Sequence, residues 1–195
     1  MSLAVAILAG GKSERMGYDK TLLEIKGIPI LKRIIDISDG LSQECLIVSN
    51  TPNMHNSFGW PVVSDFYRNK GPLGGLYTAL NSIKSERLLL LACDMPYLRH
   101  DFLNYLSRIY TKKDAVVPYD QTPQPLCSIY KKTLISTIET LIDKRQLSMR
   151  YFLKQIEVSK VLPNQWSHLI AEKKLFTNIN TPEDFANINN EPPST

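Results

Sequence analysis

Short apolar runs alternate with amphipathic patterns along the chain. The run LAVAILA at 3–9 is continuously apolar, which is typical of a strand covered on both faces. In the segment 31–40, Leu31, Ile34 and Ile35 fall on one stripe and Gly40 follows, which predicts a helix. The run RLLLLACD at 87–94 is the clearest buried strand. Further strands are expected at 45–50, 60–65, 114–119, 125–131 and 156–163, and further helices at 74–85, 100–110, 133–143, 148–155 and 181–188.

Alternation of strands and helices through the first half indicates βαβ units. We therefore predict an α/β fold: a three-layer sandwich around a mostly parallel, Rossmann-like sheet. The strands at 114–119 and 125–131 are expected to run antiparallel at one edge of it. No repeat or linker divides the chain, so 1–190 should form a single domain, and 191–195 should be a flexible tail after two prolines.

Composition narrows the class of protein. The chain has 195 residues, 43% of them hydrophobic and 22% charged, which suits one domain with a real core. Its longest apolar run, LLLLAC at 88–93, is far shorter than the roughly 20 residues of a membrane span. A thinly spread net charge of +4 fits an anionic ligand but forms no nucleic-acid footprint. We expect neither a membrane nor a nucleic acid as partner.

The cysteines and histidines do not suggest a resident metal site. The three cysteines, Cys45, Cys93 and Cys127, have no CxxC spacing and fit reduced thiols in a cytoplasm. The start of the chain lacks the basic segment of a signal peptide. The three histidines are too far apart in sequence to form a metal-ligand pair.

The stretch LAGGKSERMGYDK at 8–20 leaves the first strand with two glycines and three cations. Ligands of open parallel sheets sit beyond the carboxyl ends of the strands. There, Gly10 and Gly11 let backbone N–H groups approach an oxyanion, while Arg15 and Lys20 can hold phosphate oxygens. The spacing matches neither a Walker A motif nor a dinucleotide fingerprint. A solvated basic turn is the alternative.

Two later stretches favour the phosphate interpretation. In GPLGGLYTAL at 71–80, Gly71 begins a glycine-rich entry to a helix N-terminus, which favours negative charge. In LLLLACDMPYL at 88–98, a buried strand delivers Asp94 at its end, and a carboxylate with substrate phosphates can hold Mg²⁺. The alternatives are a close helix–strand contact for the first and a turn-capping aspartate for the second. Glycines, cations and a carboxylate together predict a nucleoside triphosphate site.

These motifs resemble those of a known family. LAGGKSERMGYDKTLLEIKGIPIL is similar to the signature LAGGxSxRMGxDKxLL of the molybdenum cofactor guanylyltransferase (MobA-like) family. GPLGGL, ACDMPYL and NINTPEDF resemble its later motifs in the same order, so the resemblance spans 4 to about 187. The family has the nucleotide-diphospho-sugar transferase fold. It transfers GMP from GTP to the terminal phosphate of molybdenum-molybdopterin, requires Mg²⁺ and releases pyrophosphate.

The resemblance implies a role for each matching residue. The catalytic candidates are Arg15 and Lys20, which would hold the triphosphate and the departing pyrophosphate, and Asp94, which would bind Mg²⁺. On the pterin side the resemblance points to Arg150, with a plain surface arginine as the alternative. The residues implied to bind the nucleotide are Leu8, Ala9, Gly10, Gly11, Lys20, Asn50, Asp65, Gly71 and Asp94, and those near the cleft without an assigned role are Asn178 and Asn180.

Three rival functions stay open. A cytidylyltransferase acting on the same pterin is the nearest, although LAGG with GPLGG favours guanine because the extra glycine leaves room for a purine. Another nucleotidyltransferase of the fold is the second, and NINTP argues against it. The third is a non-catalytic delivery protein, which should lack Lys20 or Asp94. Other molybdenum cofactor biosynthesis or acceptor proteins are expected as further partners.

Overall fold

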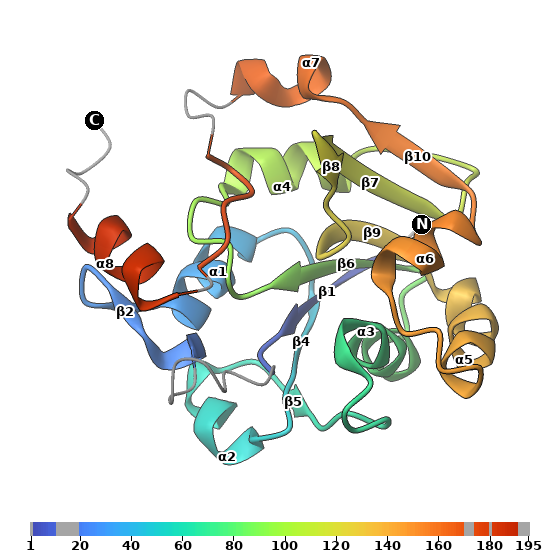
Figure 1. Cartoon of the computed structure of the whole chain (residues 1–195), viewed down its shortest axis with the longest axis horizontal. Coiled ribbons are helices and arrows are strands. Elements are labelled where there is room, and N and C mark those ends of the chain that lie inside the picture. Colours follow the sequence, from blue (N-terminus) through green and yellow to red (C-terminus); the bar gives the residue numbers. More distant parts are fainter. Residues whose placement is uncertain (1, 11–19, 170–173, 180, 191–195) are drawn as a thin grey trace.

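A single mixed sheet forms the centre of the protein (Figure 1). The computed structural model describes residues 2–10, 20–169, 174–179 and 181–190. In these, the strands follow the order β10-β7-β9-β6-β1-β4-β5, with β8 paired to β7, and β2 and β3 form a separate hairpin. The strands are β1 (Leu3–Leu8), β2 (Glu24–Ile25), β3 (Ile28–Pro29), β4 (Glu44–Val48), β5 (Val62–Val63), β6 (Arg87–Ala92), β7 (Ala115–Asp120), β8 (Thr122–Pro123), β9 (Cys127–Lys131) and β10 (Val158–Val161).

Strand directions confirm a mostly parallel sheet, with one correction. β1 runs parallel to both β4 and β6, β4 parallel to β5, and β7 parallel to β10. β9 is antiparallel to β6 and to β7, as predicted for a late pair of strands. The prediction placed this pair at an edge, and that was wrong: β9 lies between β6 and β7. Cys127 and Tyr130 are fully buried, so β9 is apolar enough for the interior, whereas β10 forms the edge.

Alternate residues of each strand enter two different cores, which makes the three layers. In β1, Ala4, Ala6 and Leu8 face a core shared with α3, α5 and α6. Val5 and Ile7 face the other core, shared with α1, α4 and α7. The helices are α1 (Ile30–Ser38), α2 (Pro52–His55), α3 (Gly71–Ser82), α4 (His100–Ser107), α5 (Ile135–Asp143), α6 (Met149–Lys154), α7 (Pro163–Trp166) and α8 (Pro182–Asn190); short 3₁₀ turns are η1 (Lys20–Leu22), η2 (Asn56–Phe58), η3 (Lys132–Leu134) and η4 (Ser167–Leu169). None of these helices is long and apolar enough to cross a bilayer.

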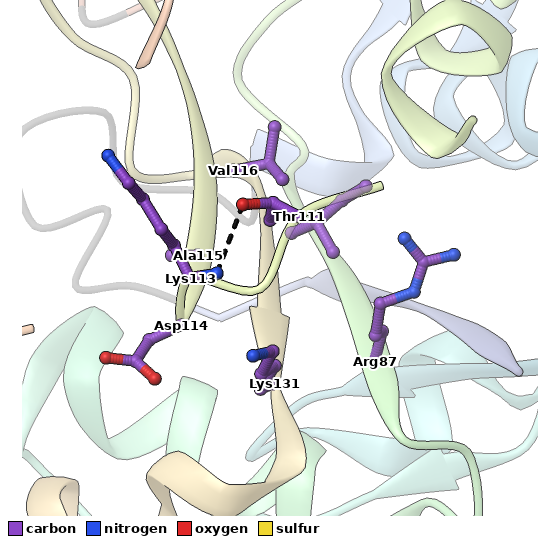
Figure 2. A pocket seen from close by; sticks show the side chains of 8 residues that line it. Arg87, Thr111, Lys113, Asp114, Ala115, Val116 and Lys131 are labelled. Atoms are coloured by element: carbon purple, nitrogen blue, oxygen red, sulfur yellow. Dashed lines mark hydrogen bonds between the residues drawn. The ribbon is translucent and has the colours of Figure 1, made fainter. Parts of the chain in front are cut away.

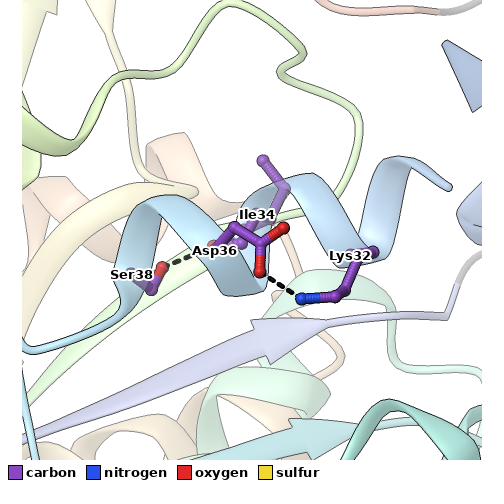
Figure 3. A network of polar contacts seen from close by, with 4 residues as sticks. All are labelled: Lys32, Ile34, Asp36 and Ser38. Carbon is purple, nitrogen blue, oxygen red and sulfur yellow. Dashed lines mark hydrogen bonds and ion pairs between the residues drawn. The ribbon is translucent and has the colours of Figure 1, made fainter. Parts of the chain in front are cut away.

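Helix α1 shows how the amphipathic pattern produces this layering (Figure 3). Its apolar stripe, which includes Ile34, is buried, while Lys32 and Asp36 form an exposed ion pair one turn apart. The Ser38 hydroxyl donates to the carbonyl of Ile34 over 2.7 Å, and the helix ends there. Gly40 has φ of +75°, which glycine adopts without the penalty of a Cβ. The predicted helix is confirmed, two residues shorter at its end.

The C-terminal helix closes the chain back onto its beginning. Ile25 of the β2–β3 hairpin, Ile30, Ile179 and Ile188 form a third small core. At the start of α8, the Thr181 hydroxyl accepts the N–H of Asp184 and the Asp184 carboxylate accepts that of Thr181, a reciprocal cap. The capped helix predicted at 181–188 is confirmed. The tail proposed at 191–195 lies outside the described residues.

Candidate nucleotide site

The predicted ligand-binding residues gather where four neighbouring strands end. β6, β1, β4 and β5 are adjacent and parallel, so their carboxyl ends share one edge of the sheet (Figure 1). Asp94 follows β6, Gly10 follows β1, Asn50 follows β4 and Asp65 follows β5. This row is the place where open parallel sheets bind their ligands, and we call it the ligand edge.

At the end of β1, the backbone hydrogen bonding to β4 continues as far as Ala9, and the exposed Gly10 follows. The Ala9 N–H donates to the Val48 carbonyl over 2.9 Å, and Ala9 is fully buried. Gly10 is exposed, and a Cβ there would lie 4.0 Å from the backbone of Ser49 and Asn50, an ordinary contact. Packing within the protein therefore does not demand glycine at position 10. Its lack of a side chain instead leaves the ligand edge open beside the strand end.

Asn50 and Asp65 meet across the edge. The Asn50 amide Nδ2 donates to Asp65 Oδ2 over 3.1 Å. Burial raises the pKa of Asp65 above its ordinary value, and hydrogen bonds from Thr78 and Asn50 oppose that rise. Thr78 also accepts the N–H of Phe66 through its hydroxyl over 3.0 Å. In the sequence, Thr78 is only a hydroxyl residue within a largely apolar helical segment, whereas in the structure it is fully buried.

Helix α3 brings its N-terminus to the same edge. It begins at Gly71, three residues earlier than predicted, because Gly71 with φ of +62° turns the chain and Pro72 suits the first helical turn. The helix then passes β1 closely: a Cβ on Gly75 would lie 2.8 Å from Cδ2 of Leu8. Gly75 therefore allows the helix to pack directly against the last residue of β1.

Asp94 is joined to the NINTP segment. The N–H of Ile179 donates to the backbone carbonyl of Asp94 over 2.9 Å. Asp94 is half-buried and its Oδ1 atom is buried. Next to Ile179, the side-chain Oδ1 of Asn178 is also buried and has no hydrogen-bond partner among the described residues. The last motif of the chain is thus joined to the backbone of the residue predicted to bind the metal.

The remaining predicted residues either lie elsewhere in the fold or fall outside the described residues. Gly11, Arg15 and Asn180 lie outside the described residues, and Lys20 begins η1. Arg150 is exposed in the first turn of α6, on the face of the sheet covered by α3 and α5. Among the described residues, no hydrogen bond or ion pair joins Arg150 to the ligand edge. Its assignment to the pterin side stays a prediction.

Two hollows are lined by residues other than those of the row. A cavity of about 10 Å³ sits at the opposite edge, beside Arg87 at the start of β6, Lys131 at the end of β9 and Asp114 (Figure 2). That volume suits a single water molecule at most. A second hollow, of about 210 Å³, lies between α1 and the segment after Asp94, where Pro96 and Leu98 line it. Within the described part of the chain, no three His, Cys, Asp or Glu side chains are grouped to hold a metal ion.

Known proteins match both the sequence and this arrangement. The family model of the MobA-like NTP transferase domain matches residues 5–160, well over half of the chain. The chain belongs to the MobA-like NTP transferase family. A molybdenum cofactor guanylyltransferase from Syntrophotalea carbinolica is 34% identical over 93% of this chain and 88% of its own length. A probable molybdenum cofactor guanylyltransferase from Clostridium perfringens is 36% identical over 95% of each chain.

Solved structures share the fold. Molybdopterin-guanine dinucleotide biosynthesis protein A from Archaeoglobus fulgidus superposes with a TM-score of 0.83 at 22% identity, over 95% of this chain and 96% of that one. A protein from Aquifex aeolicus superposes with a TM-score of 0.77 at 28% identity, over 91% and 93%. The resemblance drawn from the four motifs is therefore confirmed, and the MobA-like chain is a nucleotidyltransferase by family.

Proposed function

We propose that this chain transfers the GMP moiety of GTP to the terminal phosphate of molybdenum-molybdopterin and releases pyrophosphate. The observation that carries the proposal is the row of Gly10, Asn50, Asp65 and Asp94 along one edge of a sheet in a MobA-like chain. The names of the relatives from S. carbinolica and C. perfringens, which match over most of their length, support guanine as the base and the pterin as the acceptor.

The reaction needs positioning and charge stabilisation rather than an activated side chain. An oxygen of the pterin phosphate attacks the α-phosphorus of GTP while the bond from that phosphorus to its bridging oxygen breaks. The electron pair leaves with pyrophosphate, so atoms and charge balance without a further reactant. The nucleophile is already anionic, and the task is to hold two anions together and neutralise charge on the leaving group. Arg15 and Lys20 are the proposed cations for this task.

On the nucleotide side, the last residue of β1, Leu8, and the two residues after it, Ala9 and Gly10, would lie against the guanine, with backbone groups reading its edge. Asn50 and Asp65 would contact the base and ribose; their mutual hydrogen bond of 3.1 Å fixes both side chains in advance of binding. Helix α3 begins at Gly71, and the N-terminus of a helix stabilises negative charge, so it would stabilise the phosphates of the nucleotide.

Asp94 would hold Mg²⁺. The donor set fits, because Mg²⁺ is typically bound by one or two carboxylates together with substrate phosphates, and Asp94 offers a half-buried carboxylate at a strand end. When bound, the ion supplies Lewis-acid stabilisation of the phosphate oxygens.

Asn178, Asn180 and Arg150 are the candidates for the acceptor side. Cys45, Cys93 and Cys127 are thiols rather than parts of disulfides, which supports a reducing cytoplasm as the compartment.

Nucleotide selectivity tests the proposal. Thermal unfolding is measured with GTP, CTP, ATP or UTP, each with Mg²⁺, and pyrophosphate release is then followed with the pterin acceptor. We expect GTP to raise the midpoint most, since a ligand that binds only the folded state stabilises it by linkage. Preference for CTP would point to the cytidylyltransferase instead. Binding of GTP without any pyrophosphate release would favour a non-catalytic delivery protein.

A further inference from the structure

A buried histidine connects two segments that border the ligand edge. His55, the last residue of α2, has no exposed surface. Its Nε2 lies 2.7 Å from the hydroxyl of Thr21, and its Nδ1 lies 2.8 Å from the hydroxyl of Ser49. Both hydroxyl residues are buried as well, at 2% and 1% exposure. One ring thus bridges two chain segments inside the protein.

Each hydroxyl residue is adjacent in sequence to a residue of the proposed nucleotide site. Thr21 follows Lys20, the proposed triphosphate cation, in η1. Ser49 precedes Asn50, and its Cα lies 4.0 Å from the position of a Cβ on Gly10. The imidazole therefore connects the segment that carries the cation to the strand end that borders the base and ribose positions.

The bonding around the ring is extensive. The Ser49 hydroxyl also accepts the N–H of Thr51 over 3.0 Å, and the Ser49 N–H donates to the Val63 carbonyl over 2.9 Å, which fixes Ser49 to β5. Hydroxyl groups both donate and accept, so either ring tautomer of a neutral histidine can bond to both partners. An apolar residue of similar size would fill the space but leave two buried hydroxyls without these bonds.

We propose that His55 is a positioning residue for nucleotide binding: by bonding Thr21 and Ser49 at once, it sets the distance between η1 and the end of β4. The inference rests on the proposed nucleotidyl transfer for its functional consequence. If His55 only filled the core, it would contribute to stability alone. Nucleotide affinity would then not depend on which of its two hydrogen bonds a variant retains. The two cases differ in the behaviour of variants that keep one bond each.

Three variants separate the two bonds. His55→Gln places an amide near the position of Nε2 and can keep the bond to Thr21. His55→Asn places its amide near the position of Nδ1 and can keep the bond to Ser49. His55→Leu keeps neither. A matched control for lost packing is Ile138→Ala in α5, where the side chain is fully buried in the core shared with α3 and α6.

The first measurement is the dissociation constant and KM for GTP with Mg²⁺, alongside kcat and the midpoint of unfolding. We expect His55→Leu to weaken GTP binding about tenfold or more, with KM rising more than kcat falls. His55→Gln should recover most of the affinity and His55→Asn little of it, because the bond to η1 carries Lys20. Wild-type affinity in a folded His55→Leu variant, or affinities that follow the unfolding midpoint through Ile138→Ala, would overturn the proposal.

The second measurement needs no nucleotide and keeps the two proposals apart. Amide hydrogen exchange is followed at residues 20–25 in the ligand-free protein. Faster exchange there in His55→Leu than in wild type and Ile138→Ala, reversed in His55→Gln, supports the bridge; equal exchange in all four proteins overturns it. If the wild-type protein binds no nucleotide at all, the proposed function fails, and exchange alone then decides the role of His55.

Discussion

The central sheet has one edge where its parallel strands begin and another, the ligand edge, where they end. Polar side chains at these two edges differ in their hydrogen bonding. At the edge where β4 and β6 begin, Glu44 accepts three hydrogen bonds from the loop before β6: from the N–H groups of Lys84 and Ser85, at 2.6 and 2.8 Å, and from the Ser85 hydroxyl, at 2.5 Å. Arg87 donates to the Ile109 carbonyl over 3.1 Å, and Lys132 donates to that of Ile83. These side chains bond groups of the protein itself, although Arg87 Nε is buried without a partner among the described residues, and we call this the closed edge.

The ligand edge shows the opposite tendency. Burial raises the pKa of Asp65 above its ordinary value, whereas hydrogen bonds hold the pKa of Glu44 below its own although burial opposes them. Asn178 Oδ1 is buried without a partner among the described residues. A carboxylate disfavoured by burial and an unused amide oxygen are unfavourable for stability alone, and a bound ligand can compensate for both. The two edges therefore differ in how these carboxylates are stabilised, which agrees with the nucleotide site proposed at the ligand edge.

Among the substitutions that test this difference between the two edges, we expect the largest loss of activity from a change at Asp94. Asp94→Asn removes the charge proposed to hold Mg²⁺ while keeping the shape and the backbone bond to Ile179. We expect kcat to fall by about 10³-fold or more, since a metal contributes several kcal/mol and each 1.4 kcal/mol is tenfold in rate. The midpoint of thermal unfolding without ligand should barely change. Mg²⁺-dependent turnover near the wild-type rate would remove Asp94 from the metal site.

Gly75 tests the ligand edge through packing alone. Gly75→Ala would place a methyl group 2.8 Å from Cδ2 of Leu8, so the side chain of Leu8, the last residue of β1, must shift. We expect KM for GTP to rise about tenfold and the free energy of unfolding to fall by about 1 kcal/mol, as for mild overpacking.

The double variant Leu8→Ala/Gly75→Ala provides the control, because the new methyl group then occupies space that the leucine gives up. Its KM should return toward that of Leu8→Ala alone when both are measured in the same turnover assay. If the effects of the two single changes on KM simply add in the double variant, the contact between the two residues does not cause the rise in KM of Gly75→Ala.

Sequence patterns predicted the main strands and helices and the grouping of several candidate residues at one edge, because both follow from local order along the chain. Apolar runs that end in Gly10, Asp65 and Asp94 place those residues together once the strands are parallel. The interior position of β9 and the Asn50–Asp65 bond depend instead on how distant segments pair. The same holds for the contacts of His55, whose partners are 34 and 6 residues away and carry only common hydroxyls. No periodicity marks such a bridge.

The smallest effect is expected at the closed edge, from Glu44→Gln. Its amide offers one acceptor oxygen where the carboxylate offers two, and its NH₂ faces backbone N–H groups. We expect the free energy of unfolding at pH 7 to fall by about 1 kcal/mol, at the low end because the site is partly exposed, with turnover unchanged. Glu86→Gln, the same change of charge at an exposed neighbour of Ser85, should leave stability as it is.

The pH dependence of this difference identifies its source. Because the pKa of Glu44 is lowered in the folded protein, its stabilisation is fully present above the ordinary glutamate pKa of about 4.3 and is lost as the pH falls through the lower folded value. Denaturant unfolding of wild type and Glu44→Gln should therefore differ most above pH 6 and converge in more acidic solution. If the difference in the free energy of unfolding stays constant down to acid pH, the Glu44 side chain acts by its shape. Its charge would then not contribute to the stability of the closed edge.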